Sequence, residues 1–321
     1  MQARFKPACT APVIATFNAI ASVFLIIAIG HLLFRWRIVG ESVWSSIEHV
    51  CFYLLLPFLI VRTLSRADLT SVPIGDFALV IVVAILGMSV VLIAIERVLR
   101  HRYPDGGPSF SSVFQGATRF HGFVAIAVIG PLYGDPGLAL AALALAIIVP
   151  LLNTMSVVVL SVYGRSETRP DVVSVLEKVV TNPLIIACAV GIGFNLTGLP
   201  DVLFNTIDII GSGGLGLALL TVGAGMKPGS AAQHKLLLVV GVMTRLVGMP
   251  LIMIGMAWLV GLDGLARTVA IIAGAVPTAA SSYVMARKMG GNAELMSSIV
   301  TFQIIVAFFT LPVFIYIADH L

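Results

Sequence analysis

Long apolar runs constrain this chain more than any other feature of its sequence. A helix that crosses a bilayer needs about 20 mainly apolar residues, because it rises about 1.5 Å per residue through a hydrocarbon layer about 30 Å thick. Only 11% of the 321 residues are charged, whereas soluble domains carry about 25%. We therefore predict an all-α, polytopic membrane protein and no enzyme. The predicted transmembrane helices number ten, at approximately 13–34, 44–63, 76–96, 111–132, 137–161, 180–198, 205–225, 236–260, 267–287 and 294–317.

The distribution of positive charge predicts which side of the membrane each connection occupies. Lysine and arginine are enriched in the cytoplasmic loops of membrane proteins. The connections after the odd-numbered spans hold twelve of these residues, and the other side holds five. We therefore expect the odd-numbered connections in the cytoplasm and both termini outside. The positive residues form no basic cluster with interleaved aromatics, so nucleic acid is not an expected partner.

The chain also indicates an internal repeat. A shift of 156 positions places His121-Gly122 on Pro277-Thr278 and Tyr133-Gly134 on Met289-Gly290. An odd number of spans in each half reverses the orientation of the second half, which is the arrangement of inverted-repeat transporters. We therefore predict a first five-helix repeat in residues 1–164 and a second in residues 165–321.

The ninth span, in "AIIAGAVPTAASSYVMARKMGG", carries a proline in its middle. Pro277 cannot donate a backbone hydrogen bond, and its ring crowds the carbonyl of Ala273. Such a break survives in lipid only where protein or a water-filled cavity satisfies the freed groups. The hydroxyls of Thr278, Ser281 and Ser282 are suited to cap a new half-helix, whose free N–H groups and positive dipole end form an anion site. The alternative is a plain proline kink with the serines bonded back to the helix.

The fourth span, in "SSVFQGATRFHGFVAIAVIGPLYG", places Arg119 and His121 within an apolar stretch beside Gly116 and Gly122. Arginine inside a span usually faces a cavity or a partner, and its planar guanidinium suits a carboxylate. Histidine titrates near neutral pH and can carry a proton. Alternatively, Arg119 extends to the membrane interface and His121 is a hydrogen-bonded packing residue. Breaks in both spans at one depth predict two interrupted helices that cross at a substrate site.

Other polar residues within the spans have weaker interpretations. Asn182-Pro183 either starts a helix or places an asparagine in the cavity. Arg245 in the eighth span either pairs or extends to the interface, and Gln303 in the tenth is expected to bond to a neighbouring helix.

The three cysteines indicate no cofactor or metal site. Cys9, Cys51 and Cys188 lack the CxxC spacing that is typical of metal ligands. Packing is therefore their expected role, and we predict that the protein needs neither a metal nor a cofactor.

Several segments together resemble the auxin efflux carrier family: "FYLLLPFLIVRTL", "TRFHGFVAIAVIGPLYGDPGLALAALALAIIVPLLN", "TNPLIIACAVGIG", "LALLTVGAGM" and "AVPTAASSYVMARKMGGNAELMSSIVTFQIIVAFFTLPVF". The family is related to the bile acid symporters. Its bacterial members are described as malonate or malate permeases, and its plant members are the PIN carriers.

The resemblance implies a five-plus-five inverted repeat with interrupted, crossing fourth and ninth helices. It also implies a scaffold of helices 1, 2, 6 and 7 that forms a homodimer, a transport domain of helices 3–5 and 8–10, and a bacterial inner (plasma) membrane with both termini outside. The family often has asparagine followed by proline at the fourth-span break, whereas this chain has His121 and Gly122. That departure leaves the substrate's identity open.

The expected function is a secondary transporter for a small organic anion such as a carboxylate. The predicted binding residues are Arg119, His121, Gly122, Pro277, Thr278, Ser281, Ser282 and Asn182. A sodium-coupled symporter is a second possibility, although neither the fourth nor the ninth span contains Asp or Glu. The sequence contains no motif of an intramembrane enzyme. It also contains nothing that resembles the selectivity filter or the ring of like charges of a channel.

Overall fold

The structure, a computed structural model, describes residues 13–70, 72–99, 106–165, 177, 180–227 and 235–321. Every regular element in these ranges is a helix. In chain order, with η for a π-helical turn, they are α1 (Val13–Arg35), α2 (Glu41–Val50), η1 (Cys51–Leu55), α3 (Leu56–Ser65), α4 (Ile74–Leu99), α5 (Gly107–Thr118), α6 (Gly122–Tyr163), α8 (Pro183–Thr197), α9 (Asp201–Ser212), α10 (Gly214–Ala224), α11 (Lys235–Met243), η4 (Thr244–Gly248), α12 (Met249–Val260), α13 (Gly264–Ala275), α14 (Ser281–Lys288) and α15 (Ala293–His320).

Seven helical stretches of the described chain are long and apolar enough to cross a membrane. Two shorter apolar helices, Pro183–Thr197 and Gly264–Ala275, accompany them. The predicted class of all-helical, polytopic membrane protein is therefore confirmed, while the count of ten spans stays a prediction. The seven stretches are Val13–Arg35, Glu41–Ser65, Ile74–Val98, Gly107–Tyr163, Asp201–Ala224, Lys235–Val260 and Ala293–His320.

The stretch Gly107–Tyr163 is too long for one crossing. Its 57 residues would extend about 85 Å as a continuous helix, nearly three times the thickness of the hydrocarbon layer. The chain leaves helical geometry twice within it. Residues 119–121 separate α5 from α6, and Gly134 inside α6 has φ 62° and ψ −155°. Glycine adopts this positive φ without a Cβ clash, so the chain can turn between the predicted fourth and fifth spans.

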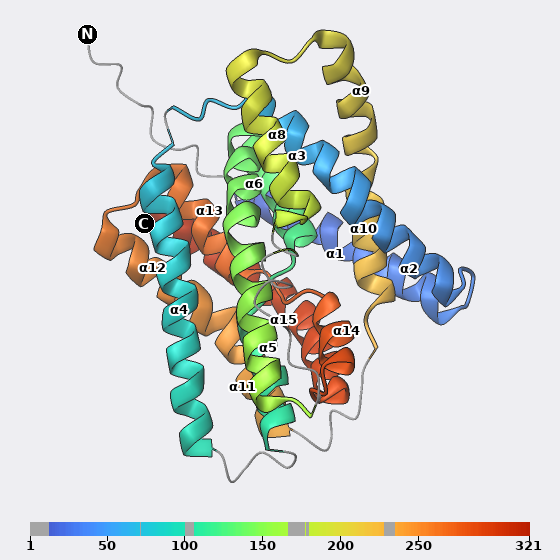
Figure 1. The fold of residues 1–321 in the computed structure, drawn as a ribbon, viewed down its shortest axis with the longest axis vertical. Coiled ribbons are helices and arrows are strands. Elements are labelled where there is room, and N and C mark those ends of the chain that lie inside the picture. Colours follow the sequence, from blue (N-terminus) through green and yellow to red (C-terminus); the bar gives the residue numbers. More distant parts are fainter. Residues whose placement is uncertain (1–12, 71, 100–105, 166–176, 178–179, 228–234) are drawn as a thin grey trace.

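The helices form two groups, and α6 contacts members of both (Figure 1). In one group α1 packs on α10, and α3 packs on α8 and α9. In the other, α12 packs on α4 and α13, while α5 packs on α11 and α15. Each group therefore combines helices from the first and second halves of the sequence.

Close packing of α1 on α10 depends on two glycines. A Cβ on Gly30 would lie 2.1 Å from the carbonyl oxygen of Leu220, and a Cβ on Gly223 would lie 1.9 Å from that of Ile27. Small residues of this kind let helix backbones approach each other in a membrane, where the hydrophobic effect does not drive helices together.

Large apolar side chains cover much of the outer surface. Ile14 and Phe17 on α1, Val90 on α4 and Val202 and Ile209 on α9 are all more than half exposed. A soluble protein would present charged side chains on such faces. These helices therefore have the surface expected of helices in contact with lipid.

Candidate functional site

The fourth predicted span is interrupted next to its arginine. Helix α5 ends at Thr118, Arg119 is extended with φ −66° and ψ 154°, and α6 begins at Gly122. His121 occupies the N-cap position of α6, and its side chain makes no capping bond. The sequence placed this interruption correctly, although Gly122 was the only helix breaker that it offered there.

The ninth predicted span is interrupted at Pro277. Helix α13 ends at Ala275, and α14 begins at Ser281 after an extended Val276. The expected hydroxyl capping is wrong, because the N-cap position falls on Ala280 and no side chain caps the helix.

The ninth-span hydroxyls make other contacts. Thr278 Oγ1 donates to the carbonyl of Gln115 at 3.4 Å and lies 3.4 Å from Ser282 Oγ. Ser281 Oγ accepts a hydrogen bond from Arg119. These hydroxyls therefore link the two interrupted spans instead of starting a helix.

Arg245 joins the two interruptions from inside the protein. Its Nε donates to the carbonyl of Val276 and its Nη2 to that of Ala273, both at 2.8 Å. Its Nη1 donates to the carbonyl of Thr118 at 3.3 Å. The residue is only 2% exposed and lies in the π-helical turn η4. Two sequence segments more than 100 residues apart thus share one guanidinium.

Gln303 on α15 makes a second, uncharged bridge between the same segments. Its Nε2 donates to the carbonyls of Gly116 at 2.8 Å and Gly241 at 2.9 Å. Its Oε1 accepts the backbone N–H of Thr278 at 2.8 Å. Since Gly116 lies in the last turn of α5, Gln303 satisfies backbone groups beside both interruptions.

The expectation that Gln303 bonds to a neighbouring helix is confirmed, but sequence reasoning named the partners of neither bridge. The sequence identified the freed carbonyl of Ala273 and assigned it no partner. It also left open whether Arg245 pairs inside the protein or extends to the membrane interface. A usable signal was present, because an arginine within an apolar span requires a polar partner inside the protein. Which carbonyls it contacts depends on helix packing that a single sequence does not reveal.

A cavity of about 750 Å³ lies beside the interruptions. Its size is within the range of small-molecule sites, about 300–1,000 Å³. Five predicted site residues line it: Arg119, His121, Gly122, Asn182 and Ser281. The other three, Pro277, Thr278 and Ser282, are buried behind its wall. Polar lining residues that the sequence did not assign to the site are Ser45, Glu48, His49, Asn153, Thr154 and Lys288.

Arg119 is a cation in the cavity lining that comes directly from the fourth-span interruption. Its Nη2 donates to Ser281 Oγ at 3.2 Å, and its Nη1 contacts Met285 Sδ at 3.2 Å. Both partners are neutral, and within the described ranges no ion pair of Arg119 with a carboxylate is found. The cavity also contains Lys288 and one carboxylate, Glu48. The guanidinium therefore retains donors and charge for an anionic ligand.

His121 and Asn182 both line the cavity, but their polar atoms have different surroundings. His121 is 6% exposed, and neither ring nitrogen has a hydrogen-bond partner in the part of the chain that the structure describes. Its role as a hydrogen-bonded packing residue therefore has no support among these residues. Asn182 Oδ1 accepts the N–H of Leu184 at 2.9 Å, so it caps α8 and lines the cavity at once.

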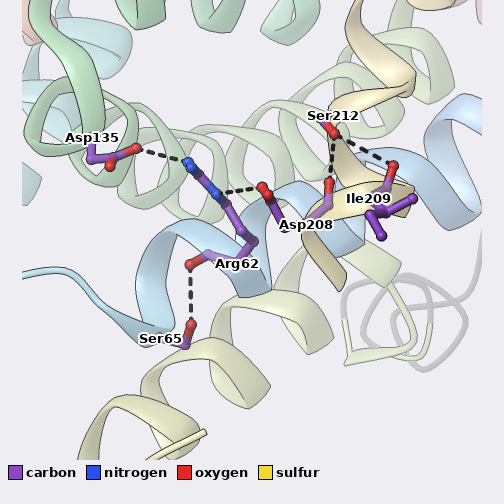
Figure 2. A network of polar contacts seen from close by, with 6 residues as sticks. All are labelled: Arg62, Ser65, Asp135, Asp208, Ile209 and Ser212. Carbon is purple, nitrogen blue, oxygen red and sulfur yellow. Dashed lines mark hydrogen bonds and ion pairs between the residues drawn. The ribbon is translucent and has the colours of Figure 1, made fainter. Parts of the chain in front are cut away.

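A separate ionic network lies away from the cavity, where Arg62 on α3 bridges two carboxylates (Figure 2). Its Nη1 is 2.7 Å from Asp135 on α6, directly after the turn at Gly134. Its Nε is 2.9 Å from Asp208 on α9. The network thus joins α6 to the group of helices that contains α3 and α9.

In the described part of the chain, no group of three or more His, Cys, Asp or Glu side chains could hold a metal ion. Cys51 and Cys188 are free and buried. Cys9 lies outside the described residues.

Comparison with known proteins identifies relatives over the whole chain. A family model described as membrane transport protein matches residues 15–169 and 166–315. An uncharacterized transporter of Methanothermobacter thermautotrophicus is 23% identical over 92% of this chain and 96% of its own length. Auxin efflux carrier component 3a of Oryza sativa is 26% identical over 44% of this chain and 24% of its own length. Auxin efflux carrier component 5 of Arabidopsis thaliana is 30% identical over 43% of this chain and 41% of its own length. The plant matches thus cover less than half of either protein.

Proposed function

Because this chain belongs to the membrane transport protein family, it is an integral membrane transporter, and we propose that it carries a small organic anion, specifically a carboxylate. The observation that carries the proposal is the guanidinium of Arg119, which lines a 750 Å³ cavity and whose hydrogen-bond partners in the described part of the chain, Ser281 and Met285, are both neutral. A planar guanidinium binds a carboxylate through two parallel hydrogen bonds. Ser281 Oγ lies next to it as a further polar atom of the cavity lining.

Alternating access is the proposed mechanism. The chain would cross the membrane ten times as a five-plus-five inverted repeat, with α5–α6 and α13–α14 as the interrupted, crossing spans. The group of α1–α3 and α8–α10 is the proposed scaffold, through which two copies dimerise. The helices from α4 to α6 and from α11 to α15 form the proposed transport domain. The mutual packing of helices within each group supports this division.

The cavity indicates which way the proposed carrier faces. Its lining extends from the interruptions to Ser45 and Lys288, which lie at predicted cytoplasmic ends of the second and ninth spans. The Arg62 network joins the proposed scaffold and transport domain near the predicted outer ends of their helices. With both termini outside a bacterial inner membrane, the structure would be an inward-facing state closed on the outer side.

Counterflow of a labelled carboxylate in proteoliposomes tests the proposal, because a carrier accelerates exchange and a channel does not. We expect Arg119→Ala to weaken substrate affinity about ten- to hundred-fold. This change corresponds to the loss of a charge-assisted hydrogen bond, which contributes about 1.5–3 kcal/mol. Arg119→Lys keeps the charge and loses the fork, so its affinity should be intermediate. Arg287→Ala is the matched control, since Arg287 is on the same helix as Ser281, is exposed and does not line the cavity. Equal exchange by the parent and Arg119→Ala would contradict the proposed site.

A further inference from the structure

The three carbonyls bound by Arg245 lie at the C-terminal ends of two half-helices. Thr118 is the last residue of α5, Ala273 is in the last turn of α13, and Val276 follows its end. The C-terminal end of a helix carries a partial charge of about −0.5. Two such ends directed at one point therefore supply roughly the charge needed to balance one cation.

The guanidinium of Arg245 is the cation at that point. Within the described ranges its hydrogen bonds go to backbone carbonyls alone, and none of the ion pairs found there involves it. Burying an unpaired charge is unfavourable. Here the partial negative charges of the two helix ends take the place of a carboxylate and stabilise the positive charge of Arg245.

We propose that Arg245 is a tethered cation that occupies the place of a coupling ion, so that the carrier binds its anion without sodium. In transporters with discontinuous helices, unwound carbonyls and half-helix C-terminal ends coordinate sodium ions or protons. In this chain, three carbonyls at the C-terminal ends of two half-helices are already bonded to the side chain of Arg245. Arg245 does not line the cavity, so it acts as a positioning residue that keeps the Arg119 segment and the Ser281 segment in contact.

This inference rests on the proposed carrier function and specifies its ion requirement. Removing the side chain should leave a small pocket of three carbonyls with no cation in it. A free guanidinium ion has the shape and donors to replace the lost group, and sodium can be coordinated by carbonyl oxygens. Loss of Arg245 should therefore convert a cation-independent carrier into one that responds to added cation.

The test compares the parent with Arg245→Ala in two measurements. The first is counterflow of a labelled carboxylate with choline replacing all sodium. The second is thermal unfolding of the purified protein with added guanidinium below denaturing concentrations, with sodium, or with tetramethylammonium, which has the same charge and no hydrogen-bond donor. Gln303→Ala is the matched control, because it removes a neutral bridge between the same segments.

We expect the parent to exchange substrate equally well without sodium. Arg245→Ala should lose at least about ten-fold in exchange, and guanidinium should restore part of that loss and raise its melting temperature. Neither effect should occur in the parent or in Gln303→Ala. If Arg245→Ala does not fold, Arg245→Lys is measured in its place. We expect Arg245→Lys to exchange substrate more slowly than the parent and still independently of sodium.

Sodium-dependent exchange by the parent would overturn the inference and leave the carrier function standing. Full exchange by Arg245→Ala, or a folded Arg245→Ala that no cation rescues or stabilises, would also overturn it, as would sodium-dependent exchange by Arg245→Lys. A parent that shows no carboxylate exchange would instead refute the proposed function. In that case the melting temperatures alone decide whether Arg245 occupies a cation site.

Discussion

Replacing Gln303 by leucine tests whether the two interrupted spans are held together by side-chain bridges. Leucine has nearly the same volume but leaves the N–H of Thr278 and the carbonyls of Gly116 and Gly241 without their partner. The side chains of both Gln303 and Thr278 are fully buried, so water does not readily replace the lost bonds. The substitution therefore isolates the polar contribution of this bridge.

The expected magnitude follows from the number of bonds. Side-chain hydrogen bonds between membrane helices contribute about 0.6 kcal/mol on average and about 1.7 kcal/mol at most. Three bonds then give a loss of about 2–5 kcal/mol in the free energy of unfolding. Leucine gains little in return, because the surrounding lipid and protein are equally apolar.

Thermal unfolding and amide hydrogen exchange measure the effect. We expect Gln303→Leu to lower the melting temperature and to speed exchange of the Thr278 amide, whose acceptor is removed. Thr301→Val is the matched control on the same helix, because Thr301 Oγ1 is buried and has no hydrogen-bond partner in the described part of the chain. It should be neutral or stabilising. Unchanged stability and unchanged Thr278 exchange in Gln303→Leu would refute the bridging role.

Three further substitutions test other parts of the structure. Gly223→Ala should destabilise the protein strongly, since its Cβ would lie 1.9 Å from a backbone oxygen of α1, whereas Gly216→Ala on the same helix meets nothing within 4 Å; equal melting temperatures would contradict the close packing. Asp135→Asn should weaken the contact to Arg62, which is 2.7 Å long with Asp135 71% exposed, by up to about 1 kcal/mol. The ratio of outward-facing to inward-facing protein should then rise up to about five-fold, as measured by distances between spin labels on the two proposed domains. An unchanged distance distribution would show that the contact between Arg62 and Asp135 does not hold the outer side closed. His121→Asn should flatten a fall in substrate affinity as pH rises from about 5.5 to 8, because a protonated ring attracts the anion; a retained slope would assign it to another group.

The sequence predicted those features that depend on local chemistry. Apolar length identified the all-helical membrane class, while the count of ten spans stays a prediction. Pro277 identified the ninth-span break because proline lacks the N–H that Ala273 needs. The fourth-span break was also located, from Arg119 and His121 beside Gly122. Each of these signals is contained within a few neighbouring residues.

What the sequence did not predict depends on contacts between distant segments. The prediction that Thr278, Ser281 and Ser282 cap the half-helix was wrong, because α14 begins only at Ser281 and its N-cap position is Ala280. The chain therefore stays non-helical longer than the proline alone requires. The guanidinium of Arg245 and the amide of Gln303 reach carbonyls in other spans, and helix packing decides that geometry. The loop charges that predict orientation lie partly outside the described residues, including Arg100, Arg102, Arg169 and Lys178.

The burial of Arg245 without a carboxylate has an electrical consequence. If the helices that hold it move relative to the membrane, their fixed positive charges move through the transmembrane field. One elementary charge corresponds to about 2.3 kcal/mol per 100 mV. A bound monoanion cancels one of these charges, so the loaded and empty carriers respond differently to voltage. Net uptake, which includes the return of the empty carrier, should then depend on membrane potential more steeply than one-for-one exchange does.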